Sequence, residues 1–178
     1  DACAAPGGKT GHLLELAPDA AVTALDASAA RLRRVEENLE RLRVAARCVS
    51  GDAGEPAGWW DGSPFDAILL DAPCTASGVV RRHPDIKLLR READVPQLAR
   101  EQARLLAALW PLLAPAGRLL YVTCSVFPEE GDEQIVRFLR ATPDARRVPP
   151  AELGEWGVAR SAGRQLLPGA TVTDGFYY

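Results

Sequence analysis

Short apolar runs that end in a polar residue alternate along this chain with helical patterns, and this alternation limits its possible folds more than any other feature. Three runs end in aspartate, at 21–26 (AVTALD), 46–52 (ARCVSGD) and 65–71 (FDAILLD), and a fourth, 117–124 (GRLLYVTC), ends in cysteine. Short apolar runs rich in valine, isoleucine and leucine are typical of strands buried on both faces of a parallel sheet. We therefore predict strands at these four places.

Helical patterns lie between these runs. The segments 28–43 and 95–113 carry apolar residues spaced mostly three or four apart, which places them on one face of a helix. The stripes are Leu32, Val35, Leu39 and Leu42 in the first segment, and Leu98, Leu105, Leu109 and Leu112 in the second. Strands that alternate with helices predict an α/β fold on a mostly parallel, doubly wound sheet with right-handed crossovers. A last short strand is predicted to start at 175–178 (GFYY).

The composition indicates the class of protein but not its partner. With 178 residues, 47% hydrophobic and 25% charged, the chain suits a single soluble domain over 1–178. No apolar run approaches the roughly 20 residues that span a bilayer, so we expect no membrane partner. The net charge of −3 does not by itself indicate nucleic acid. Nearly all basic residues are arginines, a bias that suits RNA contacts and equally suits a GC-rich genome.

The four cysteines, at positions 3, 48, 74 and 124, form no C-x-x-C pair, so we predict no zinc or other metal site. A soluble α/β chain of this size does not need disulfides, and we expect free thiols in a reducing cytoplasm. Cys48 lies inside a predicted strand, where a cysteine ordinarily acts as a small buried hydrophobic residue. We expect Cys3 to be structural as well, beside the ligand of the loop that contains it.

The chain begins unusually, because Asp1 opens directly onto a glycine-rich loop that should follow a strand. The central first strand of the sheet would then lie before residue 1. A sheet without that strand would leave backbone groups unpaired in the core, at a cost of about 1–3 kcal/mol per group. We therefore expect the natural protein to continue upstream.

The opening segment 1–10 (DACAAPGGKT) is a loop of small residues that leads into a predicted helix from about Thr10. Its Gly7 and Gly8 allow backbone N–H groups to approach a ligand at a helix N-terminus. A phosphate-binding Walker loop, and with it a nucleotide hydrolase, is excluded because Cys3 stands where that loop needs a glycine. The dinucleotide fingerprint G-x-G-x-x-G is absent from this segment as well.

Two carboxylates complete a predicted nucleoside site. Asp26 closes the next strand at about the 20-residue distance at which a carboxylate binds ribose hydroxyls in Rossmann-like folds. Asp52 closes the following strand and is expected beside the adenine. A glycine loop alone is sometimes a mere tight turn, but two acidic residues at successive strand ends favour a cofactor that contains a nucleoside.

Two further cysteines stand at the carboxyl ends of predicted strands. The segment 71–74 (DAPC) follows one apolar run, and 123–125 (TCS) closes the next. Open α/β sheets bind their ligands at this edge, where neighbouring parallel strands end side by side. We therefore predict that both thiols face one cleft and take part in chemistry rather than in packing.

Three segments resemble the motifs of one enzyme family, the Nop/Sun family of RNA cytosine-C5 methyltransferases. They are 1–10 (DACAAPGGKT), 71–90 (DAPCTASGVVRRHPDIKLLR) and 122–136 (VTCSVFPEEGDEQIV). With the tail LLPG…DGFYY the resemblance covers nearly the whole chain, and RRHPDIKLLR is most similar to the bacterial Sun branch. That branch methylates small-subunit ribosomal RNA and carries an upstream NusB-like RNA-binding domain, which is missing here. The resemblance thus implies a catalytic domain with the Rossmann-like methyltransferase fold.

The same resemblance implies S-adenosylmethionine as the cofactor and assigns roles to the candidate residues. Cys124 would attack C6 of the cytosine, and Cys74 would assist release of the product. Because the pKa of a free thiol is about 8.5, Cys124 needs help to ionise at neutral pH. Asp71 would contact either the amino acid portion of the methyl donor or the edge of the cytosine. The implied cofactor-binding set is Cys3, Ala4, Ala5, Pro6, Gly7, Gly8, Lys9, Asp26, Asp52 and Asp71.

A basic run after the DAPC segment is the best candidate for contact with RNA. It consists of Arg81, Arg82, His83 and Lys87, with Arg90 and Arg91 beyond. Contacts of this type position an RNA strand so that a target base can be turned out; the alternative is a solvated loop. A second cluster lies on the outer face of the helix predicted at 28–43, and we predict it to be surface only: Arg31, Arg33 and Arg34.

Two other functions are weighed against this one. An RNA-binding assembly factor derived from a methyltransferase would keep the fold without catalysis, but the presence of Asp71, Cys74 and Cys124 argues against it. A methyltransferase that acts on amino groups usually carries an Asn/Asp-Pro-Pro-aromatic loop after the fourth strand. This chain has Asp-Ala-Pro-Cys at that place.

Overall fold

The computed structural model describes residues 1–148, 156–169 and 173–178. The chain forms two compact units. Unit 1 comprises Asp1–Ala72 and Leu105–Leu120, and unit 2 comprises Pro73–Arg104 and Tyr121–Tyr178. Within the described ranges, no helix combines the length and apolar character needed to cross a membrane.

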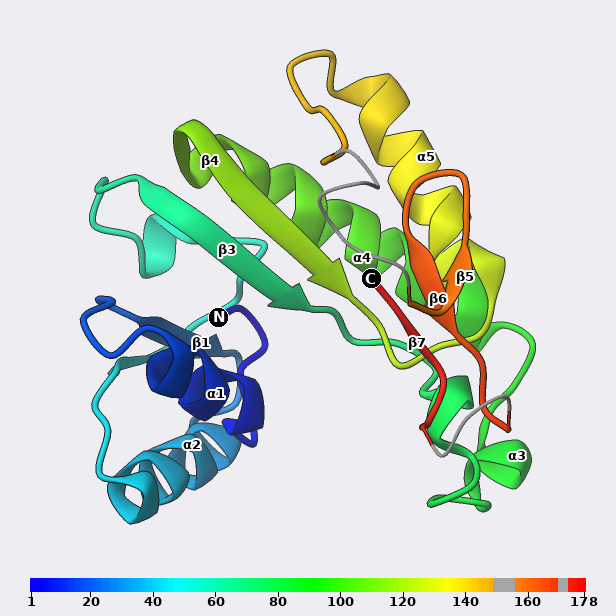
Figure 1. Cartoon of the computed structure of the whole chain (residues 1–178), viewed down its shortest axis with the longest axis horizontal. Helices are drawn as coiled ribbons and strands as arrows, with labels where there is room; N and C mark the ends of the chain where they lie inside the picture. The colour runs from blue at the N-terminus through cyan, green and yellow to red at the C-terminus, as the bar shows by residue number, and fades with distance from the viewer. Residues whose placement is uncertain (149–155, 170–172) are drawn as a thin grey trace. The chain divides into compact units, whose positions relative to one another are not determined.

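Unit 1 is built on parallel strands. β1 (Thr23–Asp26) pairs in parallel with β2 (Arg47–Ser50). β3 (Phe65–Asp71) lies beside β4 (Leu113–Val122), and Figure 1 draws the two as arrows that run the same way. These strands lie where the apolar runs of the sequence predict them.

Ala2 lies between the two strand pairs. It makes parallel bridges to Leu25 of β1 and to Leu70 of β3, and its N–H donates to the carbonyl of Leu69 at 2.7 Å. The opening residues of the chain therefore occupy the central position of the sheet, between β1 and β3. The predicted α/β fold with parallel strand pairs is confirmed.

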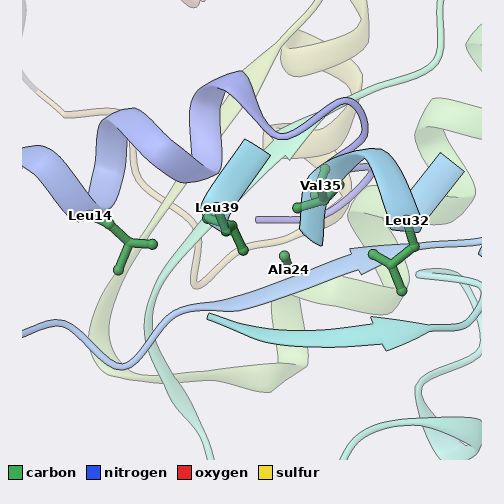
Figure 2. Close-up of a cluster of buried hydrophobic side chains, with 6 residues drawn as sticks. Leu14, Ala24, Leu32, Val35 and Leu39 are labelled. Carbon is green, nitrogen blue, oxygen red and sulfur yellow. The ribbon is translucent and has the colours of Figure 1, made fainter. Parts of the chain in front are cut away.

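Two helices of unit 1 pack against this sheet. They are α1 (Gly8–Leu16) and α2 (Ala29–Leu42). The Ser28 hydroxyl caps α2 by accepting from the N–H of Arg31 at 3.3 Å. Three residues of the predicted apolar stripe of α2 are buried, while the fourth, Leu42, is half-buried. The three pack with residues of α1 and β1 in one cluster, whose labelled members in Figure 2 are Leu14, Ala24, Leu32, Val35 and Leu39.

Unit 2 combines helices with an antiparallel sheet. Its helices are α3 (Ile86–Leu89), α4 (Asp94–Leu109) as far as Arg104, and α5 (Asp132–Ala141). Three short strands pair antiparallel in chain order: β5 (Val158–Ala159), β6 (Arg164–Leu166) and β7 (Phe176–Tyr177). β7 also meets Thr123 through an antiparallel bridge from Tyr177, so the strand predicted at 175–178 is confirmed. Short 3₁₀ helices occur at Pro56–Gly58, Ser77–Val79, Trp110–Leu112 and Pro128–Glu130.

The end of α4 differs from the prediction. The apolar spacing predicts a helix as far as residue 113, but α4 ends at Leu109 and Trp110–Leu112 continues as a 3₁₀ helix. Pro111 explains the difference, because proline has no N–H to donate and disfavours the helical conformation of the residue before it.

Three other boundaries move by a few residues. α1 begins at Gly8 rather than near Thr10, directly after the loop. β4 begins at Leu113 rather than 117, so it includes Pro115, a residue that ordinarily argues against a strand interior. β2 ends at Ser50, which leaves Asp52 in the turn that follows rather than at the strand end.

Candidate active site

Backbone and side-chain contacts hold the opening loop of unit 1 in one conformation. Gly7 has a φ of +98°, and a Cβ at this position would lie 3.0 Å from the Cα of Val35. Both observations require glycine here. The N–H of Gly7 donates to the carbonyl of Ala4 at 2.7 Å, and Asn38 of α2 donates to the carbonyl of Pro6 at 2.8 Å. The loop therefore enters α1 at a fixed angle.

The N-terminus of α1 is open to a ligand. Gly7 is the N-cap residue, and no side chain caps the helix. A Cβ placed on Gly8 would meet nothing within 4 Å, so there is open space beside the first turn. A helix N-terminus without a side-chain cap offers backbone N–H groups to an anionic or polar ligand.

Asp26 is held at the end of β1 and is only 2% exposed. Its Oδ2 accepts from the N–H of Ala5 at 3.2 Å and from Nη2 of Arg31 at 2.7 Å, and its Oδ1 accepts from the N–H of Ser28 at 3.0 Å. A carboxylate accepts about four hydrogen bonds, so Oδ1 keeps an acceptor position for a ligand hydroxyl. Arg31 is exposed, as predicted, and its guanidinium also pairs with this carboxylate.

Asp52 lies in the turn after β2 and is half-buried. Its Oδ1 accepts from the N–H of Gly54 at 2.7 Å, which fixes the side chain within the turn. The same turn is bonded to β1, because the N–H of Gly51 donates to the carbonyl of Asp26 at 3.1 Å. The two predicted nucleoside-binding carboxylates are therefore on adjacent, directly bonded segments.

Asp71 closes β3 and pairs with the opening loop. Its Oδ2 lies 2.6 Å from Nζ of Lys9, with the two side chains 30% and 37% exposed. Asp26 contacts the same loop through Ala5. Unit 1 thus brings together the predicted cofactor loop and the aspartates that close β1 and β3, while their roles stay predictions.

Cys74 and Cys124 are in contact in unit 2. Their Sγ atoms lie 3.4 Å apart, within hydrogen-bond distance for sulfur, and both are half-buried free thiols. Cys48 differs from them, since it lies in β2 and packs against the hydrophobic cluster of unit 1. Burial raises the pKa of the Cys48 thiol, as suits an inert structural cysteine.

The contact makes the two thiols chemically unequal. The hydrogen bond to Cys124, followed by burial, raises the pKa of Cys74 well above its ordinary value. A thiol that keeps its proton can donate it in a hydrogen bond to the neighbouring sulfur, and such a bond stabilises the anionic form of the acceptor. The raised pKa favours Cys74 as the proton donor of the pair.

The sequence pattern does not predict the buried carboxylate that lies beside the thiols. Glu130 is 0% exposed, and it accepts hydrogen bonds from Thr75 and Ser125. These two residues directly follow Cys74 and Cys124. One sequence signal for Thr75 and Ser125 exists, because each of the two cysteines is followed by a residue that carries a hydroxyl group.

The predicted RNA-contact run lies at the surface of unit 2, where all four of its members are exposed: Arg81, Arg82, His83 and Lys87. Nε of Arg82 lies 2.6 Å from Oδ2 of Asp174, and Nε of Arg81 lies 3.7 Å from Oδ1 of the same residue. Asp174 thus fixes the start of the run, and the arginines still face solvent. Arg90 has a different contact, since its Nε donates to the carbonyl of Thr75 at 2.7 Å and supports the Cys74 loop.

Comparisons with known proteins match this chain over its whole length. Residues 1–178 match the family described as 16S rRNA methyltransferase RsmB/F. All of the chain aligns at 52% identity with ribosomal RNA small subunit methyltransferase B of Vibrio cholerae. The chain spans 39% of the length of that relative.

Two solved structures from Pyrococcus horikoshii share the fold. NSun6 with SFG aligns over 98% of this chain and 44% of its own, with a TM-score of 0.81 and 32% identity. A methyltransferase homolog protein aligns over 99% of this chain and 57% of its own, with a TM-score of 0.80 and 31% identity. The fold is therefore the Rossmann-like α/β fold of the S-adenosylmethionine-dependent methyltransferases. The chain belongs to the 16S rRNA methyltransferase RsmB/F family.

Proposed function

We propose that the protein containing this chain transfers a methyl group from S-adenosylmethionine to C5 of a cytosine in ribosomal RNA, with Cys124 as a covalent nucleophile. Family membership supports methyl transfer to ribosomal RNA. The observation that carries the C5 chemistry is the 3.4 Å contact between Cys74 and Cys124. Methylation of an amino group or a hydroxyl needs no thiol, whereas C5 of cytosine must first be activated by a nucleophile.

In the proposed reaction the Cys124 thiolate adds to C6 of the cytosine, which forms a C–S bond and places an electron pair on C5. S-adenosylmethionine supplies an electrophilic methyl group to that carbon. A base then removes the proton from C5, and the electron pair of the broken C–H bond expels the Cys124 sulfur from C6. The Cys74 thiol donates its hydrogen bond to the Cys124 sulfur before attack and assists its departure afterwards.

The residues of unit 1 fit S-adenosylmethionine. The uncapped start of α1 suits the carboxylate of the methionine portion, and the remaining acceptor position of Asp26 suits a ribose hydroxyl. Asp52, in the next turn, suits the adenine. The NSun6 structure of P. horikoshii contains SFG, an analogue of this cofactor.

Methyl transfer itself is tested with the full-length protein and ribosomal RNA, by digesting the RNA to nucleosides and identifying the product by mass spectrometry. The proposed function predicts 5-methylcytidine. Methylation at another atom would contradict the thiol mechanism. Tight RNA binding without any methylation would instead indicate an assembly factor.

Asp26→Ala is expected to weaken binding of S-adenosylmethionine by about 1.5–3 kcal/mol, because a charge-assisted hydrogen bond is lost. Calorimetry with the full-length protein measures this change. Asp19→Ala is the matched control, since Asp19 is an exposed aspartate of the same unit, and it should leave affinity unchanged. If Asp26→Ala binds S-adenosylmethionine as tightly as the parent protein does, Asp26 is not part of the proposed site.

Neutralising Arg81, Arg82 and Lys87 together with glutamine is expected to lower RNA affinity and flatten its dependence on salt. Each lost phosphate contact reduces the slope of log affinity against log salt by about 0.7–0.9. The control removes the same charge from three other exposed arginines, Arg33, Arg34 and Arg100. If both triple variants keep the parental slope, the run is a solvated loop.

A further inference from the structure

Glu130 is a fully buried carboxylate whose acceptor positions are all occupied. Its Oε1 accepts from the N–H of Thr75 at 2.9 Å and from Nε2 of Gln102 at 3.2 Å. Its Oε2 accepts from Oγ1 of Thr75 at 2.5 Å and from Oγ of Ser125 at 2.6 Å. Since a carboxylate accepts about four hydrogen bonds, this group is saturated by donors from three segments of unit 2.

These contacts enclose Cys74 from both sides. Thr75, which follows it, donates to Glu130 through both its N–H and its hydroxyl. Pro73, which precedes it, accepts from Nε2 of Gln102 at 2.9 Å, and the same nitrogen contacts Glu130. The backbone of the Cys74 loop is therefore tied to one carboxylate.

The same residue encloses Cys124. Ser125, which follows it, donates to the Glu130 carboxylate. Thr123, which precedes it, donates through Oγ1 to the backbone carbonyl of Glu130 at 3.2 Å. The residues directly before and after each cysteine thus bond either to Glu130 or to its partner Gln102.

A buried charged side chain costs more free energy than a buried apolar one. Burying a carboxylate carries a desolvation penalty that apolar side chains of similar volume avoid, so a buried charge is weak evidence for stability alone. What the charge adds is direction, because charge-assisted hydrogen bonds are short and geometrically demanding. At this place they fix the loops on which the two sulfur atoms lie.

We propose that Glu130 is a positioning residue that holds Cys74 and Cys124 in sulfur contact for the methyl-transfer reaction. This inference rests on the proposed function for its role in catalysis, but the contact itself is measurable without any methylation. Glu130 does not need to touch RNA or cofactor. It acts through Thr75 and Ser125.

The contact is measured with phenylarsine oxide, which captures two neighbouring thiols. The arsenic–oxygen bond is replaced by two arsenic–sulfur bonds, and the two thiol protons leave with the oxygen as water, so no oxidant is involved. Full-length protein is expected to bind the reagent through Cys74 and Cys124, and serine at either position should abolish that binding. The two serine variants also measure the background binding from all other thiols of the protein, Cys3 and Cys48 among them.

Glu130→Gln is the decisive variant, because an amide cannot accept all four hydrogen bonds. We expect capture of the arsenical to weaken by at least about tenfold, the loss expected for one charge-assisted bond. We expect kcat to fall by about 100-fold through misplacement of the nucleophile, with unchanged affinity for S-adenosylmethionine. Glu129→Gln is the matched control, since Glu129 is the exposed neighbour and should retain both capture and turnover.

A second pair of variants guards against simple misfolding. Thr75→Val removes one hydroxyl donor and should lower both capture and kcat, whereas Thr75→Ser keeps the hydroxyl and should restore them. If Glu130→Gln folds and shows normal capture and turnover, the proposal is overturned. If Glu130→Gln does not fold, the Thr75 variants decide, and equal capture and turnover in Thr75→Val and Thr75→Ser would overturn the proposal. A parent protein that captures the arsenical but does not methylate cytosine would count against the proposed function, not against the positioning role.

Discussion

Replacing Gly78 with alanine is expected to destabilise unit 2 by more than about 3 kcal/mol, above the usual range for overpacking. A Cβ at this position would lie 2.1 Å from the carbonyl oxygen of Gly175 and 2.9 Å from that of Cys124. Both atoms belong to the backbone, so no side chain can rotate away. The N–H of Gly78 also donates to the Cys124 carbonyl at 2.9 Å, and a shift at Gly78 therefore moves the proposed nucleophile.

Calorimetric unfolding and methyl-transfer assays of the full-length protein test this expectation together. Gly58→Ala is the control, because a Cβ on Gly58 would meet nothing within 4 Å. The Gly78 variant should lose both thermal stability and turnover, and the Gly58 variant should lose neither. A Gly78 variant with parental stability would show that the three backbone segments at this point are not in close contact.

The sequence predicts the fold well wherever a local pattern carries the information. The spacing of Leu32, Val35 and Leu39 predicts the buried face of α2, and the apolar run at 65–71 predicts β3 with the bounds that the structure shows. The boundaries it misses depend on single residues. Pro111 ends α4 early, and β4 begins four residues before its apolar run and includes Pro115.

The site is predictable in part, for a similar reason. Strand ends are recognisable in sequence, so the candidate positions of Asp26, Asp71 and Cys124 follow from the pattern of runs. Tertiary hydrogen bonds are not recognisable there. Arg31 pairs with Asp26, and Glu130 is buried against the residues that follow both cysteines. Both contacts depend on the directions of side chains, which the spacing of apolar residues in a helix or strand does not predict.

Cys124→Ala is expected to abolish methylation and to form no covalent adduct with RNA, because the proposed mechanism assigns the attack on C6 to the Cys124 sulfur. Cys74→Ala is expected to behave differently. It should still form the bond from Cys124 and transfer one methyl group, and then stall before the sulfur leaves C6. The two variants therefore both lose turnover, but only Cys74→Ala should accumulate a denaturant-resistant RNA adduct.

The contact between the two sulfur atoms is the physical reason for this asymmetry. The hydrogen bond to Cys124 and burial raise the pKa of Cys74, which favours Cys74 as the thiol that donates to the other sulfur. Removing that donor leaves the attacking sulfur in place but without help in leaving. A denaturing gel of full-length protein, cofactor and target RNA distinguishes the variants. An adduct formed by Cys124→Ala and absent from Cys74→Ala would reverse the two roles.

The most direct measurement traps the intermediate in the unmodified protein. RNA that carries 5-fluorocytidine at the target position allows attack at C6 and methyl transfer, but the fluorine on C5 cannot leave as a proton does, so the adduct persists. Protease digestion and mass spectrometry then identify the peptide that carries the nucleotide. The proposed mechanism predicts a methylated 5-fluorocytidine bonded to the sulfur of Cys124. Modification of Cys74, or methylated RNA from the natural sequence with no adduct from the fluorinated one, would contradict it.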